Sequence, residues 1–152
     1  MKRVISLILV LLLTAALAGC GASGSKDVDV SALAAELAQK VEFSAPLKEL
    51  TAEQLGNYLT LPEGTRAAAY MASGLTMEEV FAFRCGSTGD AAAVKTAVEA
   101  LIASQIDSVR PYQPEAVPRL ESAVLVQKDV YVVLCVTDDT DTAERIIKEQ
   151  LG

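Results

Sequence analysis

The residues with the greatest capacity for chemistry in this sequence are three cysteines, Cys20, Cys85 and Cys135, and several clustered carboxylates. Cysteine can carry a lipid, form a disulfide or act as a nucleophile. Neighbouring carboxylates can bind a cation or transfer protons. The sequence has no histidine, which excludes Ser-His and Cys-His catalysis and histidine-ligated metal sites.

The charge balance bears on the class of partner. Among 152 residues, 20 are acidic and 13 are basic, and the formal net charge is −7. Nucleic-acid binding requires clustered Lys and Arg that displace counterions from phosphates. We therefore expect no nucleic-acid partner. The length favours a single domain built around one core.

The N-terminal segment predicts export. Lys2 and Arg3 give it a basic start, and residues 4–18 are apolar except for Ser6 and Thr14. A helix of that length rises about 22 Å, which is less than the roughly 30 Å of a bilayer's hydrocarbon core. The segment therefore has the pattern of a secretory signal peptide rather than of a membrane-spanning helix.

Cys20 ends the tetrapeptide Leu17-Ala18-Gly19-Cys20, which resembles the bacterial lipobox. The resemblance implies that residues 1–19 are a lipoprotein signal peptide. Cys20 would then become the mature N-terminus and carry a diacylglycerol and often a further acyl chain such as palmitate. Two or more acyl chains anchor a protein stably, so we expect a lipid-anchored protein at the cell membrane, with its domain on the extracytoplasmic side. The alternative is an ordinary signal peptide in which Cys20 is incidental.

The residues after Cys20 separate the anchor from the domain. Residues 20–27 are rich in Gly and Ser and predict a flexible tether that reaches about 15 Å. Residues 28–152 are expected to form a single α+β domain. Its first predicted helix is capped by Asp29, and its apolar residues recur at helical spacing. These residues are Val30, Leu33, Ala34, Leu37 and Val41.

Thr51-Ala52-Glu53-Gln54 fits a capping box and predicts a second, shorter helix that runs towards Tyr58. Residues 67–72 and 79–85 then predict two strands. In the second strand, Phe81, Phe83 and Cys85 alternate with Ala82 and Arg84. We expect the aromatic residues to face the core and Arg84 to face water.

The C-terminal half repeats this order. Asp90 is expected to cap the longest helix, which Pro111 ends. A second pair of strands, residues 123–127 and 130–137, flanks a turn at Lys128-Asp129. The last helix is expected from about Asp141. The predicted fold is thus two N-terminal helices followed by strand-strand-helix-strand-strand-helix, with an antiparallel sheet covered by helices.

Several stretches of the domain are similar to a known family. They are Met77-Glu78-Glu79-Val80-Phe81-Ala82-Phe83-Arg84 with the alanine-rich helix after it, Gln105, Tyr112-Gln113-Pro114-Glu115 and Val130-Tyr131-Val132-Val133. Together with the lipobox, they resemble the domain-of-unknown-function 4358 family, which is found mainly as lipoproteins of Firmicutes. The resemblance implies a cell-envelope location and assigns no catalytic residue.

Cys85 and Cys135 would lie outside the cytoplasm after export, where a disulfide is chemically feasible. We expect easy bonding if their strands are neighbours. If another strand separates them, their Cα atoms lie roughly 10 Å apart, beyond disulfide reach. The alternatives are two buried apolar thiols, which we favour, and a reactive thiol.

The carboxylate clusters have structural as well as functional interpretations. Asp138-Asp139-Thr140-Asp141 could bind calcium, but its place before a helix favours capping. Glu78 and Glu79 could be a carboxylate pair for glycoside hydrolysis. Adjacent strand residues point to opposite faces, however, so these two are not expected to converge on one bond.

Arg110, Tyr112 and Gln113 stand among prolines in an irregular segment. An exposed Tyr and Arg on a rigid turn is typical of interaction sites and could contact a partner. We favour the alternative, in which Tyr112 packs over the edge of the core and the prolines fix the crossover from helix to sheet.

Taken together, these patterns predict a non-enzymatic binding or interaction domain at the outer face of the membrane. We expect it to use no cofactor and no metal, and to bind an envelope protein or a small ligand. The alternative is an envelope enzyme or redox protein that uses carboxylates or Cys85 and Cys135.

Overall fold

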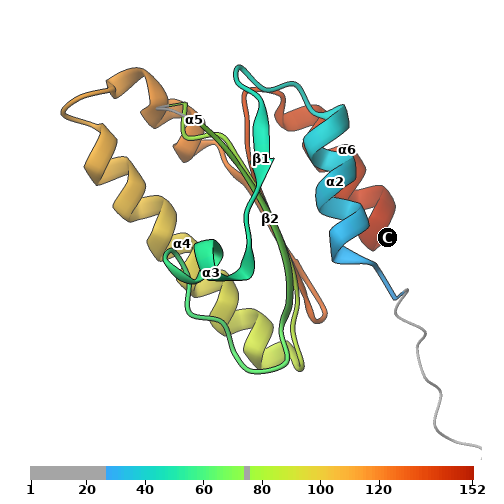
Figure 1. The fold of residues 1–152 in the computed structure, drawn as a ribbon. Coiled ribbons are helices and arrows are strands. Elements are labelled where there is room, and N and C mark those ends of the chain that lie inside the picture. Colours follow the sequence, from blue (N-terminus) through green and yellow to red (C-terminus); the bar gives the residue numbers. More distant parts are fainter. Residues whose placement is uncertain (1–26, 74–75) are drawn as a thin grey trace, which may run out of the picture.

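A five-stranded antiparallel sheet forms the centre of the molecule, with strand order β1-β2-β3-β5-β4 (Figure 1). The computed structural model describes residues 27–73 and 76–152. The predicted signal peptide, Cys20 and all of the tether except Asp27 lie outside these residues. The strands are β1 (Leu47–Glu49), β2 (Arg66–Ala72), β3 (Glu79–Arg84), β4 (Val124–Lys128) and β5 (Tyr131–Val136).

Helices cover both faces of this sheet. On one face lie α2 (Val30–Lys40) and α6 (Thr140–Leu151), and on the other lie α3 (Ala52–Gly56), α4 (Thr88–Val109) and α5 (Val117–Glu121) (Figure 1). A short 3-10 turn, η2 (Pro114–Ala116), precedes α5. The α+β fold with a helix-covered antiparallel sheet is confirmed. Within the described residues, no helix combines the length and apolar character needed to cross a membrane.

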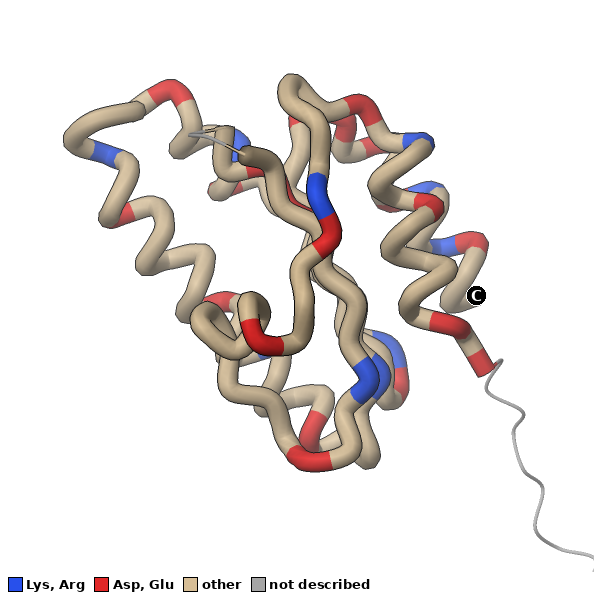
Figure 2. The backbone as a smooth tube through the Cα atoms, viewed as in Figure 1, with Lys and Arg blue, Asp and Glu red and all other residues tan. Residues whose placement is uncertain are grey.

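Because helices cover both faces, β3 and β5 are buried on both sides. Phe81 and Phe83 face α4, whereas Val80 and Ala82 face α2. We call the side of α2 and α6 the first core and the side of α3, α4 and α5 the second core. Figure 2 shows charged residues on helices, loops and some strand positions; in the two central strands, the only charged residues are Glu79 and Arg84 at the two ends of β3.

The expectation that Arg84 faces water needs correction. Arg84 is only partly exposed, and its Nε lies 3.1 Å from Asp27 Oδ1 and donates to the Tyr131 hydroxyl at 3.3 Å. The same hydroxyl accepts a hydrogen bond from the Val28 N–H at 2.9 Å. These contacts fix the point where the chain enters the domain.

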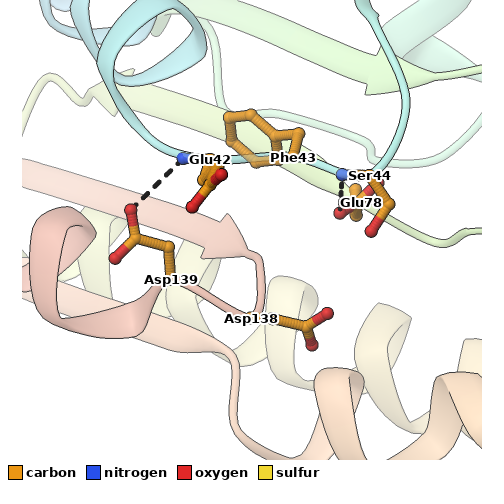
Figure 3. A pocket seen from close by; sticks show the side chains of 6 residues that line it. All are labelled: Glu42, Phe43, Ser44, Glu78, Asp138 and Asp139. Atoms are coloured by element: carbon orange, nitrogen blue, oxygen red, sulfur yellow. Dashed lines mark hydrogen bonds between the residues drawn. The ribbon is translucent and has the colours of Figure 1, made fainter.

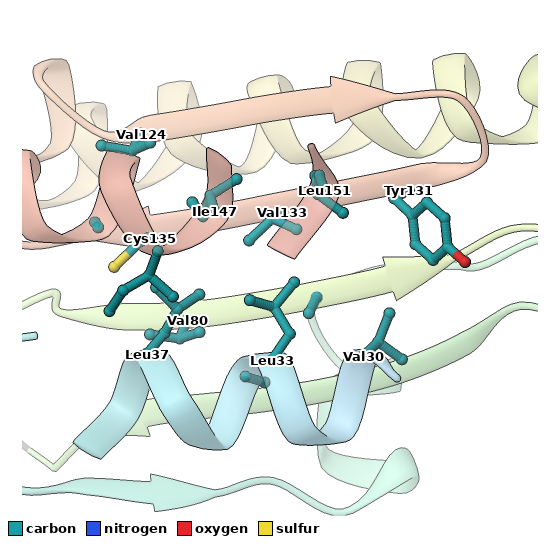
Figure 4. Packing of buried hydrophobic residues seen from close by; sticks show 14 of the residues in the cluster. Val30, Leu33, Leu37, Val80, Val124, Tyr131, Val133, Cys135, Ile147 and Leu151 are labelled. Carbon is teal, nitrogen blue, oxygen red and sulfur yellow. The ribbon is translucent and has the colours of Figure 1, made fainter. Parts of the chain in front are cut away.

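The first core confirms the predicted helix at Asp29. The Asp29 carboxylate accepts hydrogen bonds from the N–H groups of Ser31 and Ala32, which caps α2. Val30, Leu33 and Leu37 project from α2 towards the sheet and towards α6 (Figure 4). Burial of such side chains supplies the main favourable free energy for docking a helix.

Three predicted boundaries are wrong by one to three residues. Ser87, not Asp90, caps α4, because its Oγ accepts from the Asp90 N–H at 3.0 Å. Helix α6 is capped by Asp139 and begins at Thr140, one residue before the predicted start. The β4–β5 turn is Asp129-Val130 rather than Lys128-Asp129, since Lys128 pairs with Tyr131 and Asp129 adopts φ 51°.

The predicted order of elements also lacks β1, η2 and α5. Strand β1 lies between α2 and α3, so the two N-terminal helices are not consecutive elements. It has three residues, too few to show a periodic pattern. Pro111 and Pro114 predict an irregular segment, yet Pro114 begins η2. Pro118 likewise lies in the first turn of α5, where the missing N–H of proline costs little.

Candidate functional site

Arg119 on α5 links three segments at the end of the sheet where β5 finishes. Its Nε donates to Asp138 Oδ1 at 2.9 Å, and its Nη2 donates to the other carboxylate oxygen of Asp138. Its Nη1 donates to the Thr76 carbonyl at 2.7 Å, and its Nη2 also reaches Ser44 Oγ at 3.4 Å. The Arg119 side chain is only 15% exposed. It therefore joins the loop after α2, the β2–β3 connection and the β5–α6 junction.

Glu78 lies beneath this guanidinium group and is 1% exposed. Its carboxylate accepts hydrogen bonds from the N–H groups of Ser44 at 2.7 Å and Ala45 at 3.2 Å. Arg119 Nε lies 4.0 Å from Glu78 Oε1. A buried carboxylate is tolerated when hydrogen bonds and an opposite charge replace water, and Glu78 has both.

A pocket of about 450 Å³ opens above these groups (Figure 3). It is lined by Glu42, Phe43, Ser44, Glu78, Asp138 and Asp139. Asp139 Oδ2 accepts the Glu42 N–H at 3.2 Å, and Thr137 Oγ1 donates to the Glu42 carbonyl at 2.8 Å. The α2–β1 loop is thereby fixed to the end of β5, and the pocket has an acidic rim beside one aromatic ring.

The electrostatics of the rim follow from these contacts. The hydrogen bond from Arg119 lowers the pKa of Asp138, and a hydrogen bond from Thr142 is the main cause that lowers the pKa of Asp139. Both residues are thus held as carboxylates by fixed partners. Capping is the structural role of Asp139, while Asp138 serves the ion pair with Arg119. Among the described residues, no group of three or more Cys, Asp or Glu is arranged to hold a metal ion.

The Glu78-Glu79 pair diverges as predicted. Glu79 is completely buried and faces the opposite side of the sheet, where its Oε2 accepts a hydrogen bond from Gln105 Nε2 at 3.2 Å. Burial raises the pKa of Glu79 to about 7. The two carboxyl groups do not converge on a common substrate position, so they do not form a glycosidase pair.

Cys85 and Cys135 are both free and buried. Their strands are neighbours, but the prediction that neighbouring strands would allow a disulfide is wrong. The strands are antiparallel, and Val80 is the residue opposite Cys135, so Cys85 lies about 17 Å further along the sheet. The two thiols also belong to different cores. Burial raises the pKa of both and brings that of Cys135 to about 12, which disfavours a reactive thiolate.

Arg110, Tyr112 and Gln113 lie in the turn after α4. Tyr112 is 86% exposed, so the expectation that it packs over the core edge is wrong. Val109 and Ala116 occupy the core on either side of the turn, which directs Tyr112 outwards. Arg110 Nη2 lies 3.9 Å from Glu121 Oε1, and the Gln113 N–H donates to the Val109 carbonyl. None of the three lines the pocket.

Sequence reasoning did not find Arg119 or Gln105 as members of these clusters. Arg119 stands alone in a five-residue helix, and its partners lie far away in the sequence. In the sequence, Gln105 stands out only as part of the resemblance to the family. Its place on the otherwise apolar buried face of α4 is the local signal that could have indicated a polar partner.

Residues 39–137 match the model of a family described as Domain of unknown function (DUF4358). The chain belongs to this family. The matched segment contains all five strands together with Arg119, Glu78, Glu79 and Gln105. No curated protein and no solved structure matches the chain. The DUF4358 description states no activity.

We predict that Arg119→Ala lowers the free energy of unfolding by about 2 kcal/mol at neutral pH, since it removes charge-assisted hydrogen bonds above buried Glu78. The pKa of Asp138 lies below its ordinary value in the folded state. The stabilisation from the Asp138–Arg119 pair is therefore present above the ordinary pKa of an aspartate, and it is lost as the pH falls through the lowered pKa of Asp138. Chemical denaturation at pH 7 and in acid measures both effects.

Arg145→Ala is the matched control, because Arg145 forms an exposed pair with Glu149 one helical turn away. It should change stability by less than about 0.5 kcal/mol. Equal losses for the two variants would contradict the assigned role of Arg119.

Proposed function

We propose that this protein is a lipid-anchored cell-envelope lipoprotein whose domain acts as a non-enzymatic binding or interaction module on the extracytoplasmic side of the membrane. The lipobox-like Leu17-Ala18-Gly19-Cys20 supports the anchor. Membership of the DUF4358 family is compatible with this proposal and supplies no activity that competes with it.

The observation that carries the proposal is where the chain enters the domain. Asp27, the first described residue, contacts Arg84 at the last position of β3. The pocket residue Glu78 immediately precedes the first position of β3. Six strand residues separate these ends by about 17 Å. In an anchored protein, the pocket would therefore face away from the bilayer.

The turn that carries Tyr112 lies at the same distal end. Helix α4 starts just after β3 finishes and runs back along the sheet, so its C-terminus returns to the end where β3 began (Figure 1). An exposed Tyr beside an Arg on a proline-bounded turn is a composition enriched at binding hot spots. The acidic rim of the pocket favours a cationic small ligand or a basic side chain of an envelope protein.

The alternative of an envelope enzyme or redox protein receives less support. Cys85 and Cys135 are buried with raised pKa values, and Glu78 and Glu79 point to opposite faces. Neither pair provides the convergent geometry that nucleophilic or acid–base catalysis needs.

The anchor is tested by Cys20→Ser. We expect the unaltered protein to incorporate labelled palmitate, whereas Cys20→Ser does not because it lacks the thiol that carries the lipid. Ser23→Ala is a control within the predicted tether and should behave like the unaltered protein. Incorporation of palmitate into Cys20→Ser would contradict the proposal.

The binding end is tested by placing a photo-crosslinking phenylalanine analogue at position 112 or at position 58 in intact cells. Tyr58 is also exposed, at 45%, but follows α3 at a different place on the surface. We expect a discrete crosslinked product from position 112 and little from position 58. Equal yields from the two positions, or none from position 112, would argue against a binding role for this turn.

A further inference from the structure

Glu79 and Gln105 form a polar contact inside the second core. Glu79 begins β3, where it lies between Met71 of β2 and Val136 of β5. Gln105 comes from the buried face of α4 and is 8% exposed. One hydrogen bond joins them, from Gln105 Nε2 to Glu79 Oε2. The contact connects the C-terminal half of α4 to the first residue of the central strand.

Two oxygen atoms at this contact have no hydrogen-bond partner within the described residues. They are Glu79 Oε1 and Gln105 Oε1, and both are buried. Buried acceptors without partners are costly and uncommon in folded proteins. An ionised carboxylate and an amide oxygen are acceptors only, so they cannot satisfy each other.

A single proton on Glu79 would give both oxygen atoms a hydrogen-bond partner. Protonated Glu79 becomes a donor through Oε1–H, and the amide oxygen of Gln105 is the acceptor covalently adjacent to the Nε2 that already contacts Glu79. A carboxylic acid and a primary amide can then form two antiparallel hydrogen bonds. We propose that Glu79 is held protonated in the folded protein and forms with Gln105 a proton-dependent latch between β3 and α4.

The electrostatic surroundings agree with this geometry. Burial is the largest cause that raises the pKa of Glu79 to about 7, and the hydrogen bond from Gln105 opposes it. Glu78 points away from Glu79 towards the backbone of Ser44 and Ala45, and Arg119 Nε lies 4.0 Å from its Oε1. The other charged residues of the elements around the second core are exposed, partly exposed or paired elsewhere: Arg66, Arg84, Lys48, Glu49, Glu53, Asp90, Lys95, Glu99, Asp107, Arg110, Glu115, Arg119, Glu121, Lys128, Asp138 and Asp139.

The latch lies under the second half of α4, where the apolar side chains are less deeply buried. Ala91, Val94 and Val98 in its first half are fully buried, whereas Leu101, Ile102 and Ile106 are only partly buried. Ionisation of Glu79 would place an unpaired charge under this second half. The turn with Tyr112 follows directly, so the proton occupancy of Glu79 would control how firmly that exposed turn is held.

The pH dependence has a defined sign. The folded-state pKa lies above the ordinary value of 4.5, so the stabilisation is complete in acid and is lost as the pH rises through about 7. The equilibrium constant for unfolding should increase by up to about tenfold per pH unit between pH 4.5 and about pH 7, and by roughly seventyfold between pH 5 and pH 8.

Glu79→Gln tests the latch in the full chain. A second amide has the same shape and can form two hydrogen bonds with Gln105 at every pH. We expect denaturant titrations of Glu79→Gln to lack the roughly seventyfold change expected of the unaltered protein. Glu144→Gln, an exposed control on α6, should retain it. The same pH profile in Glu79→Gln and the unaltered protein would overturn the proposal.

If Glu79→Gln does not fold, the pH profile of the unaltered protein keeps the test decisive. Its free energy of unfolding should fall as the pH rises towards 7, because Glu79 then loses the proton that completes the latch. A free energy of unfolding that stays constant or rises between pH 5 and pH 8 would contradict the latch.

Hydrogen exchange locates the effect. At pH 8, the unaltered protein should exchange faster than Glu79→Gln in residues 101–113, and the two should agree at pH 5. Because the proteins are compared at the same pH, the intrinsic exchange rate cancels. A difference spread evenly over the domain would exclude a local latch.

Discussion

The burial of β3 and β5 on both faces is the constraint on which the rest of the structure depends. Alternate residues of these strands enter two separate cores, so neither face offers solvent to a polar side chain. Phe81 and Phe83 pack edge to face in the second core, while Val80 and Ala82 meet α2 in the first. Every polar group at the ends of these strands must therefore find a partner within the protein.

Those partners determine the local geometry. At one end, the Tyr131 hydroxyl binds the Val28 N–H and fixes the entry of the chain. At the other, Thr137 binds the Glu42 carbonyl, and Glu78 accepts two backbone N–H groups beside Arg119. The pocket is lined by residues that form these bonds, among them Glu42, Ser44 and Glu78. Glu79 is one residue from Glu78 but faces a different core, and an amide is the partner available there. Two adjacent carboxyl groups consequently have different chemistry.

Local patterns allowed much of this fold to be predicted. The Asp29 cap and the Thr51 capping box join residues at most three positions apart, so the sequence alone predicts them. Ser and Asp both cap helices, so the sequence does not distinguish Ser87 from Asp90 as the cap of α4. In the structure Ser87 is the cap, and Asp90 bonds to it. The pairs Arg119–Asp138 and Gln105–Glu79 join distant segments and depend on the fold itself. The opposite faces of Glu78 and Glu79 could be predicted, but not their partners.

The central claim is that the two-sided burial of β3 keeps Glu79 neutral in the folded protein. Carbon-13 NMR of the side-chain carboxyl groups, followed from acid to pH 9, tests it most directly. The claim predicts one carboxyl signal, absent in Glu79→Gln, that titrates near pH 7 while the chain stays folded. Titration of the Glu79 signal in the ordinary acid range for glutamate would contradict it.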